Sequence, residues 1–123
     1  MTVSQFRFGV RRLSLEIPAG LVDPGETPLQ AAVRELDEET GYTARDWKPL
    51  GWSFANPAFL DNRVHNFLAT DAVKAHPPHL EDGEDLEASE LTLAEIRQAI
   101  QTDTMRNSNT LLALARVFDL RDK

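Results

Sequence analysis

Apolar residues recur along this chain with two different periods. Residues 3–10 and 12–17 alternate between apolar and polar positions or run apolar, which is typical of β-strands. Residues 28–40 instead carry apolar side chains at intervals of three and four, which predicts an amphipathic helix. The apolar stripe of that helix is formed by Leu29, Ala32, Val33 and Leu36.

The ends of this helix are marked by local signals. Thr27 is a suitable N-cap, Pro28 suits the first helical position, and Gln30 completes a capping-box pattern. Gly41 is a natural stop after the last turn, because glycine adopts the left-handed conformation without penalty. We therefore expect a helix from about Pro28 to Thr40.

The second half of the chain continues the alternation of strands and helices. Thr92 with Glu95 forms another capping box, and an acidic, proline-rich loop precedes it. The pattern predicts strands within 48–55 and 63–70, a loop over 75–85, a short strand over 86–91, and helices over 92–102 and 109–120. Strands with interspersed helices indicate an α/β or α+β layered fold, and 123 residues suit a single domain over 1–123.

Composition and charge argue against several classes of partner and favour one location for the protein. No apolar run is long enough to cross a membrane, and we expect no membrane partner. The formal charge is −7, whereas a general nucleic-acid binder is usually basic, so we expect no nucleic-acid partner. The chain lacks cysteine and opens without a basic-then-apolar signal segment, which favours a cytoplasmic location.

One segment carries a dense pattern of charged residues and glycines. From Gly20 to Tyr42 it reads Gly, five residues, Glu, seven residues, Arg-Glu-Leu, one residue, Glu-Glu, one residue, Gly and an apolar residue. On a helix, Glu35, Glu38 and Glu39 lie at i, i+3 and i+4 and share one face, where their charges repel. Mg²⁺ or Mn²⁺ would relieve that repulsion, because hard cations prefer oxygen ligands.

Other positions in and beside the pattern are expected to shape the site. The carbonyl of Ala19, just before the segment, is a candidate further metal ligand. Glu26 and Arg34 are expected to form a salt bridge that joins the loop to the helix. Gly20 and Gly41 allow close backbone approach or positive φ. An ordinary solvated acidic surface is the alternative reading of the three carboxylates.

The complete pattern resembles the Nudix box of the Nudix hydrolase family. This resemblance implies an α/β/α sandwich around a mixed β-sheet, and cleavage of a nucleoside diphosphate linked to another group. It implies that Glu35, Glu39 and Glu38 bind the metal, with Glu38 also a candidate catalytic residue. The metal would polarise the phosphate and activate water for attack on phosphorus.

Features outside the box resemble the ADP-ribose pyrophosphatases and related nucleoside-diphosphate-sugar enzymes. They are Gln5-Phe6-Arg7 followed by residues 15–20 (LEIPAG), a proline about fifteen residues past the box, and an acidic loop over 81–87. The resemblance implies that Arg7 and Pro57 contact the substrate. It also implies a general base in the acidic loop, where Asp82 and Glu84 are the candidates and Glu84 is favoured. ADP-ribose, giving AMP and ribose 5-phosphate, is the leading substrate.

The chain also departs from this subgroup. Pro57-Ala58 stands where the subgroup often has Pro-Gly, and the chain lacks the N-terminal region that precedes the Gln-Tyr-Arg strand in larger members. The resemblance implies a homodimer. In larger members the N-terminal region contributes strands to that dimer. Other substrates stay open, namely coenzyme A, a dinucleoside polyphosphate, GDP-mannose or a damaged nucleotide. A domain that senses a nucleotide without hydrolysing it is a second alternative. Five aromatic residues that could stack on a base are expected to lie in the core: Phe6, Phe8, Trp47, Trp52 and Phe59.

Overall fold

The computed structural model describes residues 1–80 and 85–121. The strands are β1 (Thr2–Arg7), β2 (Arg12–Glu16), β3 (Tyr42–Phe54), β4 (Arg63–Lys74) and β5 (Leu86–Ser89). The helices are α1 (Pro28–Thr40), α2 (Leu93–Gln101) and α3 (Ser108–Ala115). Asp82 and Glu84 therefore lie outside the described residues.

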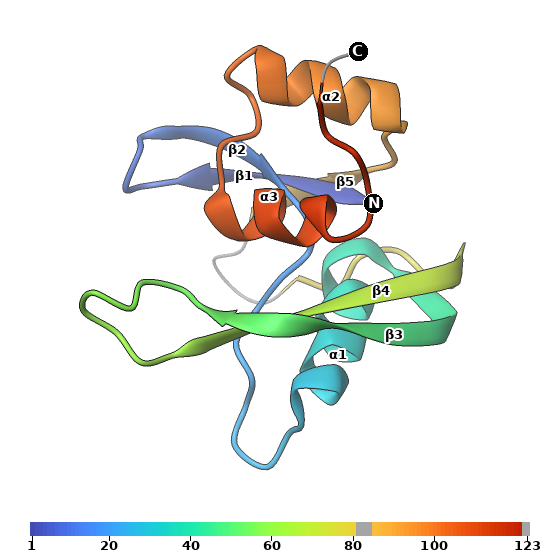
Figure 1. The fold of residues 1–123 in the computed structure, drawn as a ribbon. Helices are drawn as coiled ribbons and strands as arrows, with labels where there is room; N and C mark the ends of the chain where they lie inside the picture. Colours follow the sequence, from blue (N-terminus) through green and yellow to red (C-terminus); the bar gives the residue numbers. More distant parts are fainter. Residues whose placement is uncertain (81–84, 122–123) are drawn as a thin grey trace.

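The strands form two antiparallel sheets. The first has the order β2-β1-β5, and the second is the ribbon of β3 and β4. Figure 1 shows α2 beside the first sheet at one end of the molecule and α1 beside the β3–β4 ribbon at the other, with α3 between the sheet and the ribbon in this view. The expected α+β class is confirmed, but the mixed sheet implied by the resemblance is not seen, because every strand pairing among the described residues is antiparallel.

Helix α1 begins and ends where its capping signals indicate. The Thr27 hydroxyl accepts from the Gln30 amide at 3.2 Å, and the Gln30 side chain accepts from the Thr27 amide at 2.9 Å. At the other end, Gly41 has φ 75° and its amide donates to the Asp37 carbonyl at 2.8 Å. These short-range bonds satisfy backbone groups that a helix end leaves open, so the sequence alone suffices to place both ends.

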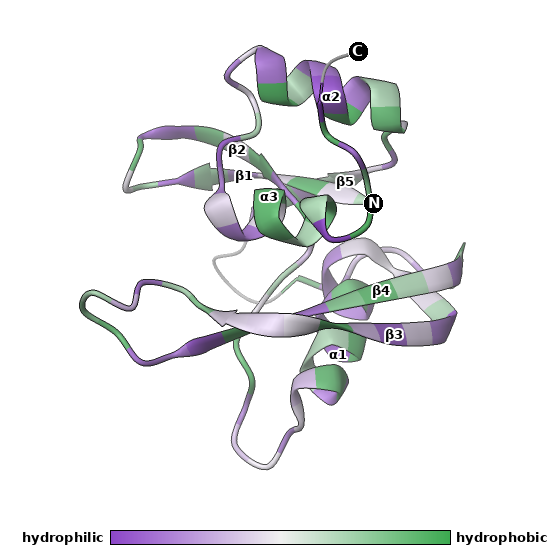
Figure 2. Ribbon diagram, in the orientation of Figure 1, coloured by the Kyte–Doolittle hydropathy of each residue, from purple (hydrophilic) through white to green (hydrophobic). Residues whose placement is uncertain are grey.

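The main apolar cluster lies between the last two helices and the first sheet. Met105 is 1% exposed and packs with Ile96, Ala99 and Leu114, while Leu15 of β2 packs against this cluster. Figure 2 shows hydrophobic and hydrophilic residues alternating along α2, as expected for a helix with one buried face. No helix within residues 1–80 and 85–121 has the length and apolar content of a membrane span.

Several sequence-based boundaries were wrong. Strand β3 begins at Tyr42 rather than near residue 48, and it continues through Pro49 and Gly51 by a register shift between them. The expected strand over 3–10 ends at Arg7, because residues 8–11 form the turn into β2. The last helix ends at Ala115 rather than near residue 120. The ribbon accommodates Pro49 and Gly51 within β3 through this local irregularity in its pairing with β4.

The aromatic residues depart most from expectation. Phe8 and Phe59 are 86% and 84% exposed, and Phe6 and Trp52 are also exposed, at 42% and 44%. Only Trp47 among the five is partly buried. Aromatic residues usually fill cores, but the two hairpins that carry these side chains extend past the helices that would cover them (Figure 1). The expectation that they lie in the core was therefore wrong for four of the five residues.

Candidate functional site

Arg34, in the middle of α1, is the centre of a network of ion pairs. Its guanidinium donates to Glu26 at 2.7 Å, to Glu35 at 2.8 Å and to Glu38 at 3.2 Å. It also donates to the backbone carbonyl of Leu21 at 3.0 Å. The expected Glu26–Arg34 salt bridge is thus present, and the same guanidinium also holds two of the three clustered carboxylates. One planar side chain can do this because it presents five donors in a fixed fork.

The charges in this network shift the ionisation of its members. The hydrogen bond from Arg34 lowers the pKa of Glu26 to about 2, with a further hydrogen bond from the Asp23 amide. The hydrogen bond to Glu26 in turn raises the pKa of Arg34 above its ordinary value. Both groups therefore stay charged at neutral pH, and the loop before α1 is tied to the helix by charged hydrogen bonds.

Glu35 and Glu39 converge on the two residues that precede and open the motif. Glu39 is only 6% exposed, and its carboxylate accepts from the Ala19 amide at 3.3 Å. A Cβ added to Gly20 would lie 2.1 Å from the Glu35 carboxyl group. Glycine therefore permits an approach of the Glu35 carboxyl group that another residue would block.

These carboxylates are not arranged as a complete metal cage. Within residues 1–80 and 85–121, no group of three or more acidic or histidine side chains is close enough to hold a metal ion. Glu35 and Glu38 are drawn to Arg34, whereas Glu39 faces Ala19. The expected sharing of one helix face is present, but Arg34 compensates the charge of two of the three carboxylates.

Arg7 lies near this acidic region but is paired with Glu16. Its guanidinium donates to the two Glu16 carboxylate oxygens at 3.0 and 2.7 Å, and the Glu16 side chain is 5% exposed. Burial works to raise the pKa of Glu16, but hydrogen bonds from Arg7 and Ser14 outweigh burial, and the pKa lies below its ordinary value. The charge of Glu39 also helps to raise the pKa of Arg7, which places these two residues within electrostatic range.

The sequence analysis did not predict the ion pair between Arg7 and Glu16. Strands β1 and β2 pair with Val3 opposite Glu16 and Arg7 opposite Arg12. Alternation along β1 then puts Val3 and Arg7 on one face, so Glu16 shares the face of Arg7. This could have been found by fixing the hairpin register first, because a one-residue slip would separate the two charges.

Among the other expected site residues, Pro57 can be placed in the fold, whereas Asp82 and Glu84 lie outside the described residues. Pro57 is exposed in the connection between β3 and β4. Residues 76–79, which precede Asp82 and Glu84 in the chain, are joined to α1 by two contacts. The His79 amide donates to the Glu38 carbonyl at 2.7 Å, and His76 pairs with Asp37 at 2.5 Å.

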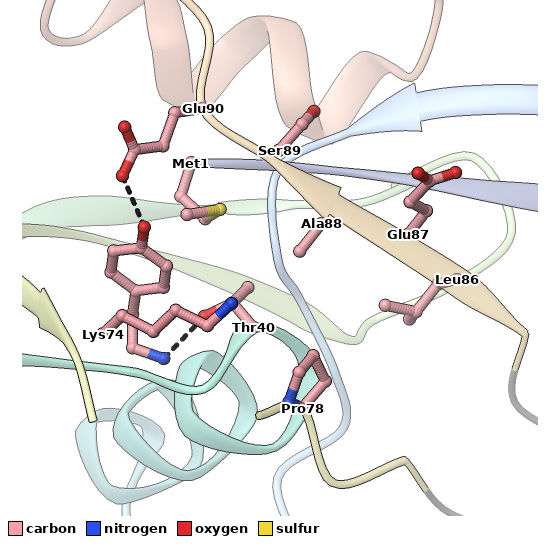
Figure 3. Close-up of a pocket in the computed structure, with 10 residues that line it drawn as sticks. Met1, Thr40, Lys74, Pro78, Leu86, Glu87, Ala88, Ser89 and Glu90 are labelled. Carbon is pink, nitrogen blue, oxygen red and sulfur yellow. Dashed lines mark hydrogen bonds between the residues drawn. The ribbon is translucent and has the colours of Figure 1, made fainter. Parts of the chain in front are cut away.

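A pocket of about 350 Å³ lies beyond the C-terminal end of α1 (Figure 3). Tyr42 and Glu90 both line it; the Tyr42 hydroxyl donates to Glu90 at 2.5 Å, and this hydrogen bond raises the pKa of Tyr42. Lys74 and Glu87 also line the pocket. None of the three clustered carboxylates of α1 is among its lining residues, so it is separate from the Arg34 network.

Comparison with known proteins agrees with this geometry. The NUDIX domain matches residues 3–113, and the chain belongs to this family. It is 36% identical over 113 residues to an ADP-ribose pyrophosphatase of Bacillus subtilis, which covers 91% of this chain and 61% of that protein. It is 34% identical to a methanol dehydrogenase activator of Bacillus methanolicus, with the same coverage. A solved ADP compounds hydrolase superimposes with a TM-score of 0.81 at 27% identity, over 94% of this chain and 62% of that one.

The chain thus spans about three fifths of the length of these relatives. The residues that match the NUDIX domain, 3–113, run from β1 into α3 and so include the two sheets, α1 and the Arg34 network of this chain. The fold and the family are therefore shown for this part.

Proposed function

We propose that this domain hydrolyses the diphosphate linkage of a nucleoside diphosphate derivative, with ADP-ribose as the leading substrate. The observation that carries the proposal is the convergence of Glu35 and Glu39 on Ala19 and Gly20, where glycine is needed for the approach. The names of two relatives, an ADP-ribose pyrophosphatase and an ADP compounds hydrolase, favour an adenosine diphosphate compound.

The donor set suits a divalent metal. Carboxylate and carbonyl oxygens are the ligands that Mg²⁺ and Mn²⁺ prefer, so Glu35, Glu39, Glu38 and the Ala19 carbonyl would hold the ion. When bound, the ion supplies charge that polarises the phosphate and lowers the pKa of water. Glu39 suits this role because it is a largely buried carboxylate beside the loop that opens the motif.

The remaining residues bind, orient and transfer protons. Arg34 fixes the Glu35 and Glu38 carboxylates and ties the loop to α1 through Glu26. Arg7 supplies positive charge for the phosphates, and its ion pair with Glu16 orients it. Glu84, which lies outside the described residues, is the favoured base to accept a proton from the attacking water, with Asp82 as the second candidate.

Replacing Glu39 tests this assignment. Glu39→Gln keeps the size of the side chain and an acceptor for the Ala19 amide, but it removes one charge. We expect hydrolysis of ADP-ribose in Mg²⁺ to fall by about 100-fold or more, since loss of a group that only supports a ligand already costs about 10- to 100-fold. The measurement is kcat/KM with product identification over a panel of nucleoside diphosphate compounds, with and without Mg²⁺.

Glu95→Gln is the matched control, because it removes the same charge from an exposed position on α2 outside the Arg34 network. It should retain the rate of the unmodified protein. Full activity of Glu39→Gln would disprove the metal assignment. Failure of the unmodified protein to turn over any compound in the panel would disprove the proposed function and would leave a nucleotide-binding domain.

A further inference from the structure

The outer half of the β3–β4 ribbon presents an exposed face of two aromatic and two basic side chains. In this ribbon Trp52 pairs with His65 and Phe54 pairs with Arg63. Residues directly opposite each other in an antiparallel pair share a face, and alternate residues of one strand do as well. All four side chains therefore lie on one face, which is called here the stacking face: Trp52, Phe54, Arg63 and His65.

The side chains of the stacking face are more exposed than those of the opposite face of the ribbon. Each of the four residues of the stacking face is exposed, with Trp52 at 44% and Phe54 at 45%. On the other face, Ser53 and Val64 are partly buried and Asn66 is buried. This outer half of the ribbon thus turns Ser53, Val64 and Asn66 inward and its aromatic side chains toward solvent. Since exposure of large aromatic side chains is costly in water, an exposed group of them often marks a binding surface.

The aromatic rings of the stacking face are held in a defined arrangement. The Trp52 and Phe54 rings pack edge to face with centroids 5.1 Å apart, and the Arg63 guanidinium carbon lies 4.2 Å from the Trp52 ring centroid. Among the described residues, the Arg63 side chain forms no hydrogen bond or ion pair. Its donors are therefore available to a ligand while its plane rests on the indole.

A contact from α3 anchors the backbone beneath this face. The Arg116 guanidinium donates to the Leu50 carbonyl at 2.8 Å and to the Trp52 carbonyl at 3.4 Å. These bonds lie on either side of Gly51, where the register of the ribbon shifts. The position of Trp52 is thus fixed by a different element, so a ligand would meet an ordered surface.

We propose that the stacking face binds a nucleotide, with the base against Trp52 and Phe54 and a phosphate near Arg63 and His65. Aromatic side chains bind bases through their faces, and arginine adds charge and a planar surface. Charge favours this occupant, since the face carries basic groups on a chain with a net charge of −7. The inference extends the proposed function, on which it rests for the choice of nucleotide, and it concerns residues outside the carboxylate site.

Binding of AMP without divalent metal tests this site separately from hydrolysis. In a Trp47→Phe background, Trp52 is the single tryptophan, and its emission should change saturably with AMP but not with ribose 5-phosphate, which lacks a base. By calorimetry, Phe54→Ala should weaken AMP binding about 5- to 100-fold. Arg63→Gln should weaken AMP binding and reduce its dependence on salt.

Phe8→Ala is the matched control, because it removes an exposed phenyl ring that also packs edge to face with another aromatic ring, Phe6, in the other hairpin. It should leave the AMP affinity unchanged, and circular dichroism should show that all variants fold. Equal loss in Phe8→Ala and Phe54→Ala, or no response of Trp52 to millimolar AMP, would overturn the proposal. So would a change from dimer to monomer in Phe54→Ala with unaltered AMP binding, which would make the face a contact between copies of this chain. AMP binding that persists in an inactive Glu39→Gln variant would support the stacking face while leaving hydrolysis a separate question.

Discussion

At the scale of single residues, the site depends on one arginine that serves several carboxylates. Arg34 bonds to Glu26, Glu35 and Glu38, so its removal would free three negative charges at once. Charged hydrogen bonds in a partly buried network are stronger than exposed ion pairs, and their geometry is fixed by the fork of the guanidinium. Arg34 therefore orders the loop and orients the proposed ligands together.

Gly20→Ala should disturb the proposed ligands while leaving the fold intact. The added methyl group would overlap the Glu35 carboxyl group, which must then move away from the Ala19–Gly20 backbone. Gly20 is not in the left-handed region, so alanine adds no backbone strain there. We expect Mn²⁺ affinity, measured by calorimetry, to fall about 10-fold or more with a small change in the free energy of unfolding.

Gly9→Ala is the control for this substitution, since a Cβ at Gly9 would meet no atom within 4 Å. It should bind Mn²⁺ like the unmodified protein. Unaltered Mn²⁺ affinity in Gly20→Ala would show that Glu35 does not bind the metal from its present position.

Glu26→Gln should reduce stability in a manner that depends on pH. The pKa of Glu26 is lowered from 4.5 to about 2 in the folded protein, so its charged form stabilises the fold above its unfolded pKa. That contribution is fully present at neutral pH and is lost as the pH falls from about 4.5 toward 2. The stability deficit of Glu26→Gln in urea unfolding should therefore be constant above about pH 6 and shrink in acid. A deficit that does not change with pH would contradict the ion pair as its cause.

At the scale of secondary structure, the clearest dependence is that of the β3–β4 ribbon on α3. Gly51 has φ 115°, and a Cβ there would lie 2.8 Å from a nitrogen of Arg116. Glycine is therefore required both by the backbone conformation and by the approach of the guanidinium. The direction of the outer ribbon is set by these two residues together.

Gly51→Ala should loosen the outer ribbon selectively. A residue with a side chain in this conformation costs about 1–3 kcal/mol, and the displaced Arg116 would release the Leu50 and Trp52 carbonyls. Hydrogen exchange should become faster in residues 52–54 and 63–65 than in α1. Arg116→Lys should show the same pattern more weakly. Uniformly faster exchange over the whole chain would point to global destabilisation instead.

At the scale of the whole molecule, stability depends on the cluster around Met105. This side chain joins α2, α3 and the first sheet, and it is 1% exposed. Met105→Ala should lower the free energy of unfolding by about 2–5 kcal/mol, because the surrounding helices can only partly close the cavity. Urea unfolding measures this loss. Val10→Ala, at a residue that is 61% exposed, should stay within about 0.5 kcal/mol of the unmodified protein.

Much of the fold was predictable where the signals were local. The capping residues Thr27 and Gly41 determine α1 because their hydrogen bonds join residues three or four apart. The start of β3 was missed because residues 42–47 join the strand through their pairing with β4, which lies about twenty to thirty residues further along the chain. The core position expected for Trp52 and Phe8 was wrong because burial depends on which distant elements pack over a hairpin.

Residue spacing along the chain is enough to define the motif from Gly20 to Tyr42, the helix that carries it, and the pairing of Glu26 with Arg34. These features follow from spacing along one helix and its adjoining loop. Only the tertiary structure decided that Glu39 is buried beside Ala19, that Arg7 pairs with Glu16, and that the stacking face is exposed. Each of these depends on strand register or on packing between elements far apart in the chain, and local propensity carries no information about either.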